Sequence, residues 1–215
     1  QGKPQISYNS NVSFDKVSVL PDFQTTYAQG SGGKYAPMAS TSWGPRIEEL
    51  ANDATYGGNK DNAFTKQYGL HEGQYYVTQR ANAGLDPWAT PQAYNNAKDF
   101  FNVGNTFNNS LNIMQGFEKG SYAMSLGATN ANGIVPSTGM DRYTAKLSGE
   151  AKLSDKFTTG FTGNFIHSKI TKQTGANNGI IATLYGAPAS YYLGGIPSSY
   201  LNNPTKQNTY RTTGG

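Results

Sequence analysis

The chain has 215 residues, and only 14% of them are charged, whereas ordinary soluble domains have about 25%. Its 17 basic and 13 acidic side chains leave a net charge of +4 that is scattered along the sequence, so a nucleic-acid-binding surface is not expected. The lack of cysteine excludes disulfides, cysteine-ligated metals and thiol catalysis, and no apolar stretch approaches the ~18 residues of a transmembrane helix.

Apolar and polar residues alternate over residues 4–15. Ile6, Tyr8, Val12 and Phe14 fall on one face, and polar residues fall on the other. A period of two residues over this length predicts a β-strand.

The next segment, residues 16–105, has no strand pattern and is punctuated by glycine-rich turns and prolines. One short helix is predicted near its end, with Thr90 as the N-cap and Pro91 at the first helical position. Residues at helical spacing follow these two: Ala93, Tyr94, Ala97 and Phe101.

Alternation returns after residue 105 and predicts an antiparallel series of four more strands, at 106–117, 121–129, 142–153 and 157–168. Tight turns separate the first pair and the last pair, and the longer connection 130–141 lies between them. Residues 169–215 again lack sustained alternation.

These strands and connections are typical of a transmembrane β-barrel, in which strands of about 9–11 residues alternate between short periplasmic turns and long extracellular loops. Residues 16–105, 130–141 and 169–215 would then be extracellular loops. Outward aromatic residues would form two girdles, Phe14, Phe107 and Tyr143 at the extracellular end and Phe117, Tyr122 and Phe157 at the periplasmic end. Residues expected to face the lumen are Asn9, Asn11, Asn112, Lys146, Glu150 and Asn164.

A soluble antiparallel sandwich or jelly roll shows the same alternation and is the alternative interpretation. The order of long and short connections and the sorting of aromatics favour the barrel. Because single-chain outer-membrane barrels start at about 8 strands, five strands predict an arc of a larger barrel. We therefore expect the chain to be a segment of a larger protein.

Several stretches of this chain resemble the SusC/RagA-like TonB-dependent outer-membrane transporters. Residues 2–17 (GKPQISYNSNVSFDKV) resemble the first barrel strand after the plug domain of that family. Shorter similar stretches follow in the family's order, at 20–24, 30–35, 42–45, 98–101, 104–110, 133–136, 153–156, 184–188 and 207–211. The resemblance spans nearly the whole chain and implies its first five or so barrel strands.

The resemblance implies a 22-stranded plugged barrel in the full protein, with the plug domain and the rest of the barrel outside this chain. It implies uptake of glycans or peptides across the bacterial outer membrane, with a SusD-like surface lipoprotein as partner. Energy would come from the TonB–ExbB–ExbD complex through N-terminal regions outside this chain.

Other motifs carry little chemistry. The stretch 30–35 (GSGGKY) has a tyrosine after its lysine, where a phosphate-binding loop has Ser or Thr. His71 and His167 are isolated, so no metal is expected. No nucleophile, base and oxyanion group come together, so we expect neither an enzyme nor a cofactor.

Loop aromatics are the candidate ligand- or partner-binding residues, because such rings stack on sugars and anchor protein partners. They are Trp43, Tyr56, Tyr75, Tyr76, Trp88, Tyr185, Tyr191 and Tyr192. The alternative role for each is to pack the long loops together.

Three functions therefore remain as expectations. The first is a segment of a SusC-like importer with an oligosaccharide or peptide substrate. The second is a soluble or surface-exposed β-rich glycan-binding or adhesin module, and the third, weaker one is a secreted glycan-active enzyme.

Overall fold

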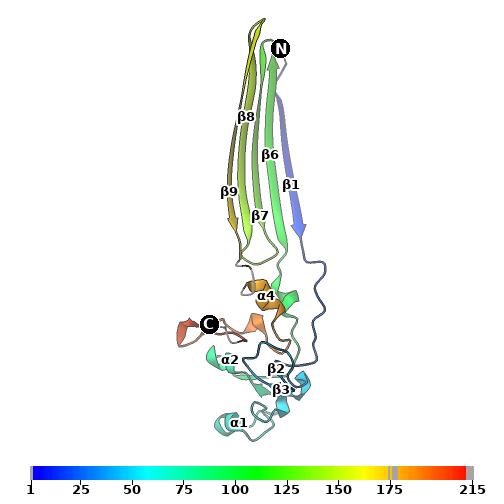
Figure 1. Cartoon of the computed structure of the whole chain (residues 1–215), viewed down its shortest axis with the longest axis vertical. Helices are drawn as coiled ribbons and strands as arrows, with labels where there is room; N and C mark the ends of the chain where they lie inside the picture. The colour runs from blue at the N-terminus through cyan, green and yellow to red at the C-terminus, as the bar shows by residue number, and fades with distance from the viewer. Residues whose placement is uncertain (1, 174, 176–178, 212–215) are drawn as a thin grey trace. The chain divides into compact units, whose positions relative to one another are not determined.

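The computed structural model describes residues 2–173, 175 and 179–211, and the chain divides into two compact units (Figure 1). The sheet unit comprises Gln1–Ser18 and Phe101–Gln173, and the loop unit comprises Val19–Phe100 and Thr174–Gly215. The predicted segment 169–215 includes residues 174, 176–178 and 212–215, which lie outside the described residues.

The sheet unit is a five-stranded antiparallel sheet with the order β1-β6-β7-β8-β9 (Figure 1). Each strand pairs with the next along this order, and the bounds are β1 Gln5–Asp15, β6 Gly104–Phe117, β7 Gly120–Asn132, β8 Gly139–Ser154 and β9 Phe157–Thr171. The predicted antiparallel β class is confirmed.

The connection between β7 and β8 is shorter than the predicted loop 130–141 and covers only residues 133–138. Pairing continues through Asn130↔Asp141 and Asn132↔Gly139, where the apolar alternation has already ended. The predicted loop bounds were wrong because backbone hydrogen bonds between two strands form without apolar side chains. Strand pairing therefore extends beyond the end of the apolar alternation.

The register gives the sheet two chemically different faces, because directly paired residues point to the same side. One row across the sheet is Tyr8–Leu111–Leu126–Ala145–Phe165, and the next is Ile6–Ile113–Met124–Leu147–Gly163. We call this side the apolar face. Its large side chains are exposed, with Tyr8 at 65% and Phe165 at 64%.

The opposite side is the polar face, and its central row is Ser7–Asn112–Ser125–Lys146–Asn164. It also carries a few apolar residues, among them Met114, Ile166 and Ile170. The alternation is therefore strict in the rows named above and looser elsewhere, since Ser10 and Asn109 lie on the apolar face.

The loop unit contains several short elements, so the prediction of a single short helix in the long loops was wrong. Its helices are η1 Ile47–Asn52, α1 Ala63–Tyr68, α2 Thr78–Asn82, α3 Asn96–Phe100, α4 Ile180–Tyr185 and η2 Leu193–Gly195. Its strands are β2 Gly30–Ser31, β3 Lys34–Tyr35, β4 Tyr75–Tyr76, β5 Trp88–Ala89, β10 Ser199–Tyr200 and β11 Asn203–Gln207. Most of these are too short for periodicity to reveal.

The predicted helix at Thr90 begins later, at Asn96. The Tyr94 N–H donates to the Ala189 carbonyl at 2.8 Å, which holds the preceding backbone away from the helix. The Asn95 Oδ1 then accepts from the Lys98 N–H at 3.0 Å and serves as the cap. A long-range hydrogen bond thus overrides the local signal of Pro91.

Both segments of the loop unit contribute to one hydrophobic core, formed by Ala28, Tyr35, Ile47, Leu50, Tyr75, Val77, Ala189, Tyr191, Ile196 and Tyr210. Buried polar groups join the segments across the core. The Gln29 N–H donates to Ser190 Oγ at 3.0 Å, and Asn208 Nδ2 donates to the Gln79 carbonyl at 2.8 Å. The two regions predicted as separate loops therefore fold as one unit.

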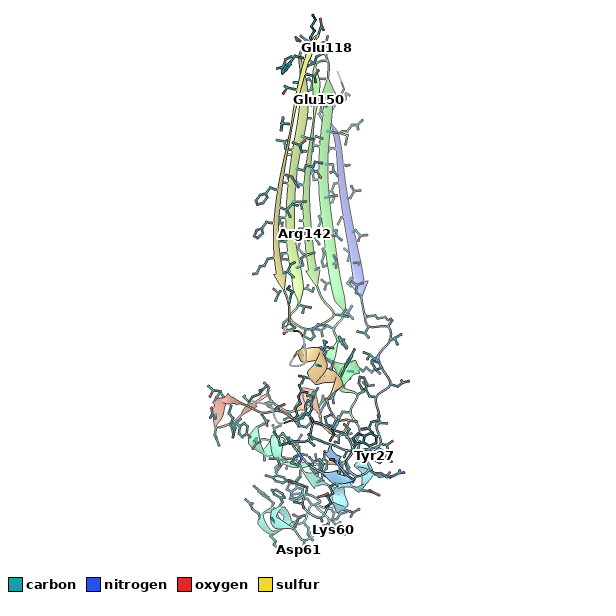
Figure 2. The ribbon with its side chains drawn as sticks, viewed as in Figure 1. Tyr27, Lys60, Asp61, Glu118, Arg142 and Glu150 are labelled. Carbon is teal, nitrogen blue, oxygen red and sulfur yellow. The ribbon has the colours of Figure 1, made fainter. Side chains whose placement is uncertain are left out.

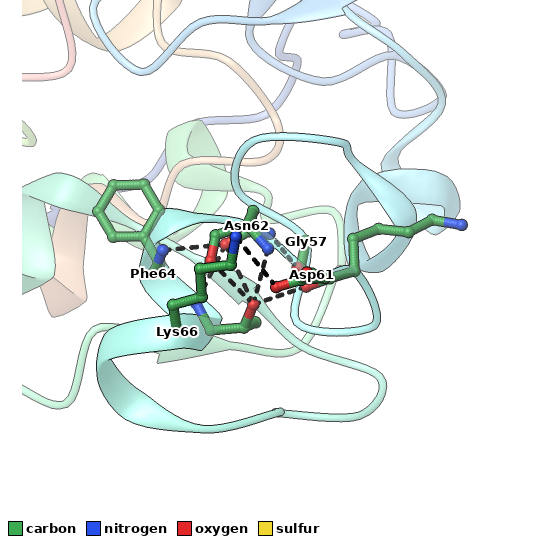
Figure 3. A network of polar contacts seen from close by, with 7 residues as sticks. Gly57, Asp61, Asn62, Phe64 and Lys66 are labelled. Carbon is green, nitrogen blue, oxygen red and sulfur yellow. Dashed lines mark hydrogen bonds and ion pairs between the residues drawn. The ribbon is translucent and has the colours of Figure 1, made fainter.

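Helix α1 shows how local sequence builds this unit (Figure 3). Asn62 Oδ1 accepts from the N–H groups of Phe64 and Thr65 at 3.0 and 3.1 Å, and Thr65 Oγ1 accepts from the Asn62 N–H at 2.9 Å. This reciprocal capping box satisfies backbone donors at the start of the helix. Among the described residues, no helix has the length and apolar character needed to cross a membrane.

The stretch 30–35 forms a hairpin between β2 and β3. Gly32 and Gly33 occupy its tip with φ of 57° and 74°. Two consecutive positive φ values match a type I′ turn, which glycine adopts without strain. The glycines of this motif therefore serve a turn.

Candidate functional site

All six residues predicted to face the lumen lie on the polar face. The register pairs Asn9 with Ser110 and Asn11 with Asn108, while Asn112, Lys146 and Asn164 belong to one row. Glu150 lies farther along β8 toward the turn that contains Glu118 (Figure 2). The structure shows that they share a face, and the lumen itself remains a prediction.

Hydrogen bonds between strands organise the polar face. Ser125 Oγ donates to Asn112 Oδ1 at 2.7 Å, and Arg142 Nε donates to Ser168 Oγ at 3.1 Å. Within the described part of the chain, Lys146 and Glu150 have no ion-pair partner. Their charges are therefore free to meet another chain segment or a solute.

Four of the eight predicted binding aromatics are buried in the loop unit. Tyr75, Tyr76, Trp88 and Tyr191 are 3–6% exposed. Tyr76 stacks on Phe64 with centroids 3.8 Å apart and meets Trp88 edge-on at 5.6 Å. These rings pack the loops together, which is the alternative role that the sequence left open.

Burial also changes the acidity of several of these phenols. Loss of solvation raises the pKa of Tyr75 and of Tyr191 well above the usual value. Desolvation, with the neighbouring phenols of Tyr75 and Tyr56, raises the pKa of Tyr35 in the same way. These hydroxyls stay neutral at physiological pH and serve the core as uncharged groups.

The other predicted aromatics remain open to solvent to different extents. Trp43 is 69% exposed and lies 6.4 Å from Tyr27 between centroids. Tyr192 stacks on Tyr94 at 4.7 Å, and Tyr185 is 39% exposed. Tyr56 is partly buried against the core.

A cavity of about 280 Å³ opens on the loop unit beside Tyr185. Its walls come from three stretches far apart in sequence, residues 20–25, 94–97 and 184–187, together with Ser42 and Ala189. Phe23 and Tyr185 lie with centroids 5.5 Å apart and planes tilted by 60°. Sequence reasoning missed Phe23 and Tyr94 because only folding brings these stretches together.

The two histidines lie in different units and contact aromatic residues or strand neighbours. His71 stacks on Trp88 with centroids 4.2 Å apart, and His167 pairs with Tyr143 on the apolar face. Among the described residues, no group of three His, Cys, Asp or Glu side chains is placed to hold a metal ion.

Comparison with models of known protein families and with curated proteins found no match for this chain.

Proposed function

We propose that this chain is part of a TonB-dependent nutrient importer of the bacterial outer membrane, similar to the SusC/RagA-like transporters. The five-stranded sheet would form an arc of the barrel wall, and the loop unit would lie outside the cell. The full protein would take up oligosaccharides or peptides together with a SusD-like lipoprotein. TonB–ExbB–ExbD would act through regions outside this chain.

The observation that carries this proposal is the exposed apolar face. Its rows hold large side chains from all five strands, including Ile6, Leu126 and Leu147, which are 67%, 39% and 44% exposed. A contiguous apolar surface across a whole sheet is unfavourable in water and marks contact with lipid or protein. Lipid covers such a face in an outer-membrane barrel.

On β7, β8 and β9 the same face turns polar near the start of β8, which fits a membrane boundary, while β6 and β1 keep apolar residues in that row. Asn130 Nδ2 donates to Asp141 Oδ1 at 2.9 Å, and the register pairs Asp141 with Lys169. Tyr143 and His167 occupy the adjacent row. Tyrosines beside a polar row are typical of the bilayer interface, where one side of the ring is apolar and the hydroxyl is hydrated.

The test is the behaviour of the full protein with and without detergent. We expect a monodisperse species only in detergent micelles or lipid nanodiscs, because the apolar face associates when nothing covers it. Sedimentation velocity measures this directly. A full protein that stays monodisperse in plain buffer would disprove the importer proposal.

A surface-exposed glycan-binding or adhesin module is the second candidate, favoured by the cavity and exposed rings of the loop unit. It needs no lipid contact. Retained ligand binding by a detergent-independent protein would support this candidate over the importer.

A further inference from the structure

The cavity beside Tyr185 is lined by aromatic and polar residues, and two of its aromatic residues are partly open to solvent. Phe23 and Tyr185 are 36% and 39% exposed, so part of each ring is open to a ligand. Tyr94 lines the cavity too, and its stack on Tyr192 at 4.7 Å and 9° holds its ring in place. Rings held before a ligand arrives lose little conformational freedom on binding.

Three residues that line the cavity have a side-chain polar group without a hydrogen-bond partner within the described part of the chain. These groups are the Asp22 carboxylate, the Ser42 hydroxyl and the Asn95 Nδ2, whereas Asn95 Oδ1 is used by the Lys98 N–H. Gln24, in the same wall, differs because its amide already bonds the backbone of Thr26 and Tyr27. The three free groups therefore offer donors and acceptors to a solute.

We infer that this cavity binds an uncharged saccharide, with one sugar ring packed on Phe23 and Tyr185 and its hydroxyls bonded to Asp22, Ser42 and Asn95. The C–H face of a sugar ring packs on an aromatic ring, while its hydroxyls need paired donors and acceptors. The volume of about 280 Å³ lies just below the ~300–1,000 Å³ of drug-sized ligand pockets and fits a single ring. The inference rests on the proposed function. Of the two nutrient classes proposed there, oligosaccharides and peptides, it selects the oligosaccharides.

The chemistry of the lining argues against the other solutes. No lysine, arginine or histidine lies among the described lining residues, so a peptide carboxyl terminus or an acidic glycan would meet Asp22 without a counter-charge. Extended peptides also bind by adding to a free strand edge, and the walls of the cavity are loops, α3 and α4. A neutral sugar needs neither feature.

The test is binding of the full protein to an array of immobilised neutral, sialylated and sulfated oligosaccharides. The protein is kept in a detergent without a sugar headgroup, because a maltoside headgroup is itself a candidate ligand. We expect binding to neutral members only. No binding to any neutral member, or binding confined to acidic ones, overturns the inference.

Variants then locate the site by isothermal titration with the best neutral oligosaccharide. Tyr185→Ala and Phe23→Ala should each weaken binding by about tenfold or more, and Asp22→Asn by a smaller factor. Tyr68→Ala is the matched control, because Tyr68 is also exposed and in ring contact but lies on α1 outside the cavity. Equal weakening by Tyr68→Ala, or none by Tyr185→Ala and Phe23→Ala, overturns the inference.

Near-ultraviolet circular dichroism confirms that each variant is folded before its affinity is compared. Failure here can be told from failure of the importer proposal, because the cavity variants leave the apolar face unchanged. A protein that needs detergent but binds no neutral sugar refutes only this inference. A detergent-independent protein that binds sugar through Tyr185 refutes only the importer.

Discussion

Single buried side chains hold the loop unit together. Asn96 is 8% exposed, and its amide bridges two backbone groups of the distant C-terminal segment. Its Nδ2 donates to the Tyr191 carbonyl at 2.8 Å, and its Oδ1 accepts from the Leu193 N–H at 3.0 Å. Sequence alone does not single out this asparagine from its neighbour Asn95, which caps a helix at the surface.

Replacing Asn96 with alanine leaves those two backbone groups without partners. We expect Asn96→Ala to lower the free energy of unfolding by about 1–3 kcal/mol for each group left buried and unpaired. Lys98→Ala, an exposed change on the same helix, should alter it by less than about 0.5 kcal/mol. Denaturant unfolding followed by near-ultraviolet circular dichroism measures both, and equal effects would contradict this role.

The buried phenols predict a loss of stability in alkali. The pKa of Tyr35 is raised in the folded chain, mainly by burial, while an unfolded tyrosine titrates near ~10. The folded state therefore keeps a proton that the unfolded state releases, so stability is complete below pH ~10 and falls as the pH rises above it.

Unfolding free energy measured against pH should decline above pH ~10, accompanied by cooperative appearance of tyrosinate absorbance. Tyr35→Phe should reduce the steepness of that decline. Gradual, independent titration of all tyrosines would contradict the burial of Tyr35.

At the scale of elements, backbone conformation determines which positions of the short hairpin between β2 and β3 require glycine. Gly30 has a φ of 142°, and a Cβ there would lie 2.0 Å from the Lys34 carbonyl oxygen. At Gly32, with a φ of 57°, a Cβ would meet no atom within 4 Å.

Gly32→Ala should therefore cost only the backbone penalty of about 1–2 kcal/mol, and Gly30→Ala should cost more because the hairpin must also move apart. Thermal unfolding of the two variants checks this order. A larger loss for Gly32→Ala would show that the close approach at Gly30 is relieved cheaply.

The two faces of the sheet predict opposite tolerance of charge. If lipid covers the apolar face, Leu126→Arg should destabilise the folded full protein in lipid by about 2–4 kcal/mol, as arginine does near the middle of a bilayer. Ser148→Arg places the same side chain on the polar face, between Lys146 and Glu150 along β8, and should cost far less. Unfolding in lipid vesicles distinguishes the two, and similar losses would argue against a lipid-covered face.

Over the whole molecule, the sheet was more predictable than the loop unit. The five strands overlap the ranges predicted from alternation, because a two-residue period is written locally in residues such as Ile6, Tyr8 and Val12. The helices α1, α2 and α4 were missed because each is only five or six residues long and has no proline near its start, unlike the region of α3.

The candidate site likewise has one part that the sequence predicts and another that only the folded structure reveals. That Asn112, Lys146 and Asn164 share a face follows from parity along each strand, which the sequence by itself determined. Whether Tyr75 or Tyr185 is open to a ligand was decided only by the tertiary structure, which buries the first and exposes the second. The physical reason is the separation along the sequence. Strand parity arises between neighbouring residues, whereas the core and cavity of the loop unit form only when segments about a hundred residues apart meet. The hydrogen bond from Asn96 to Tyr191 is an example.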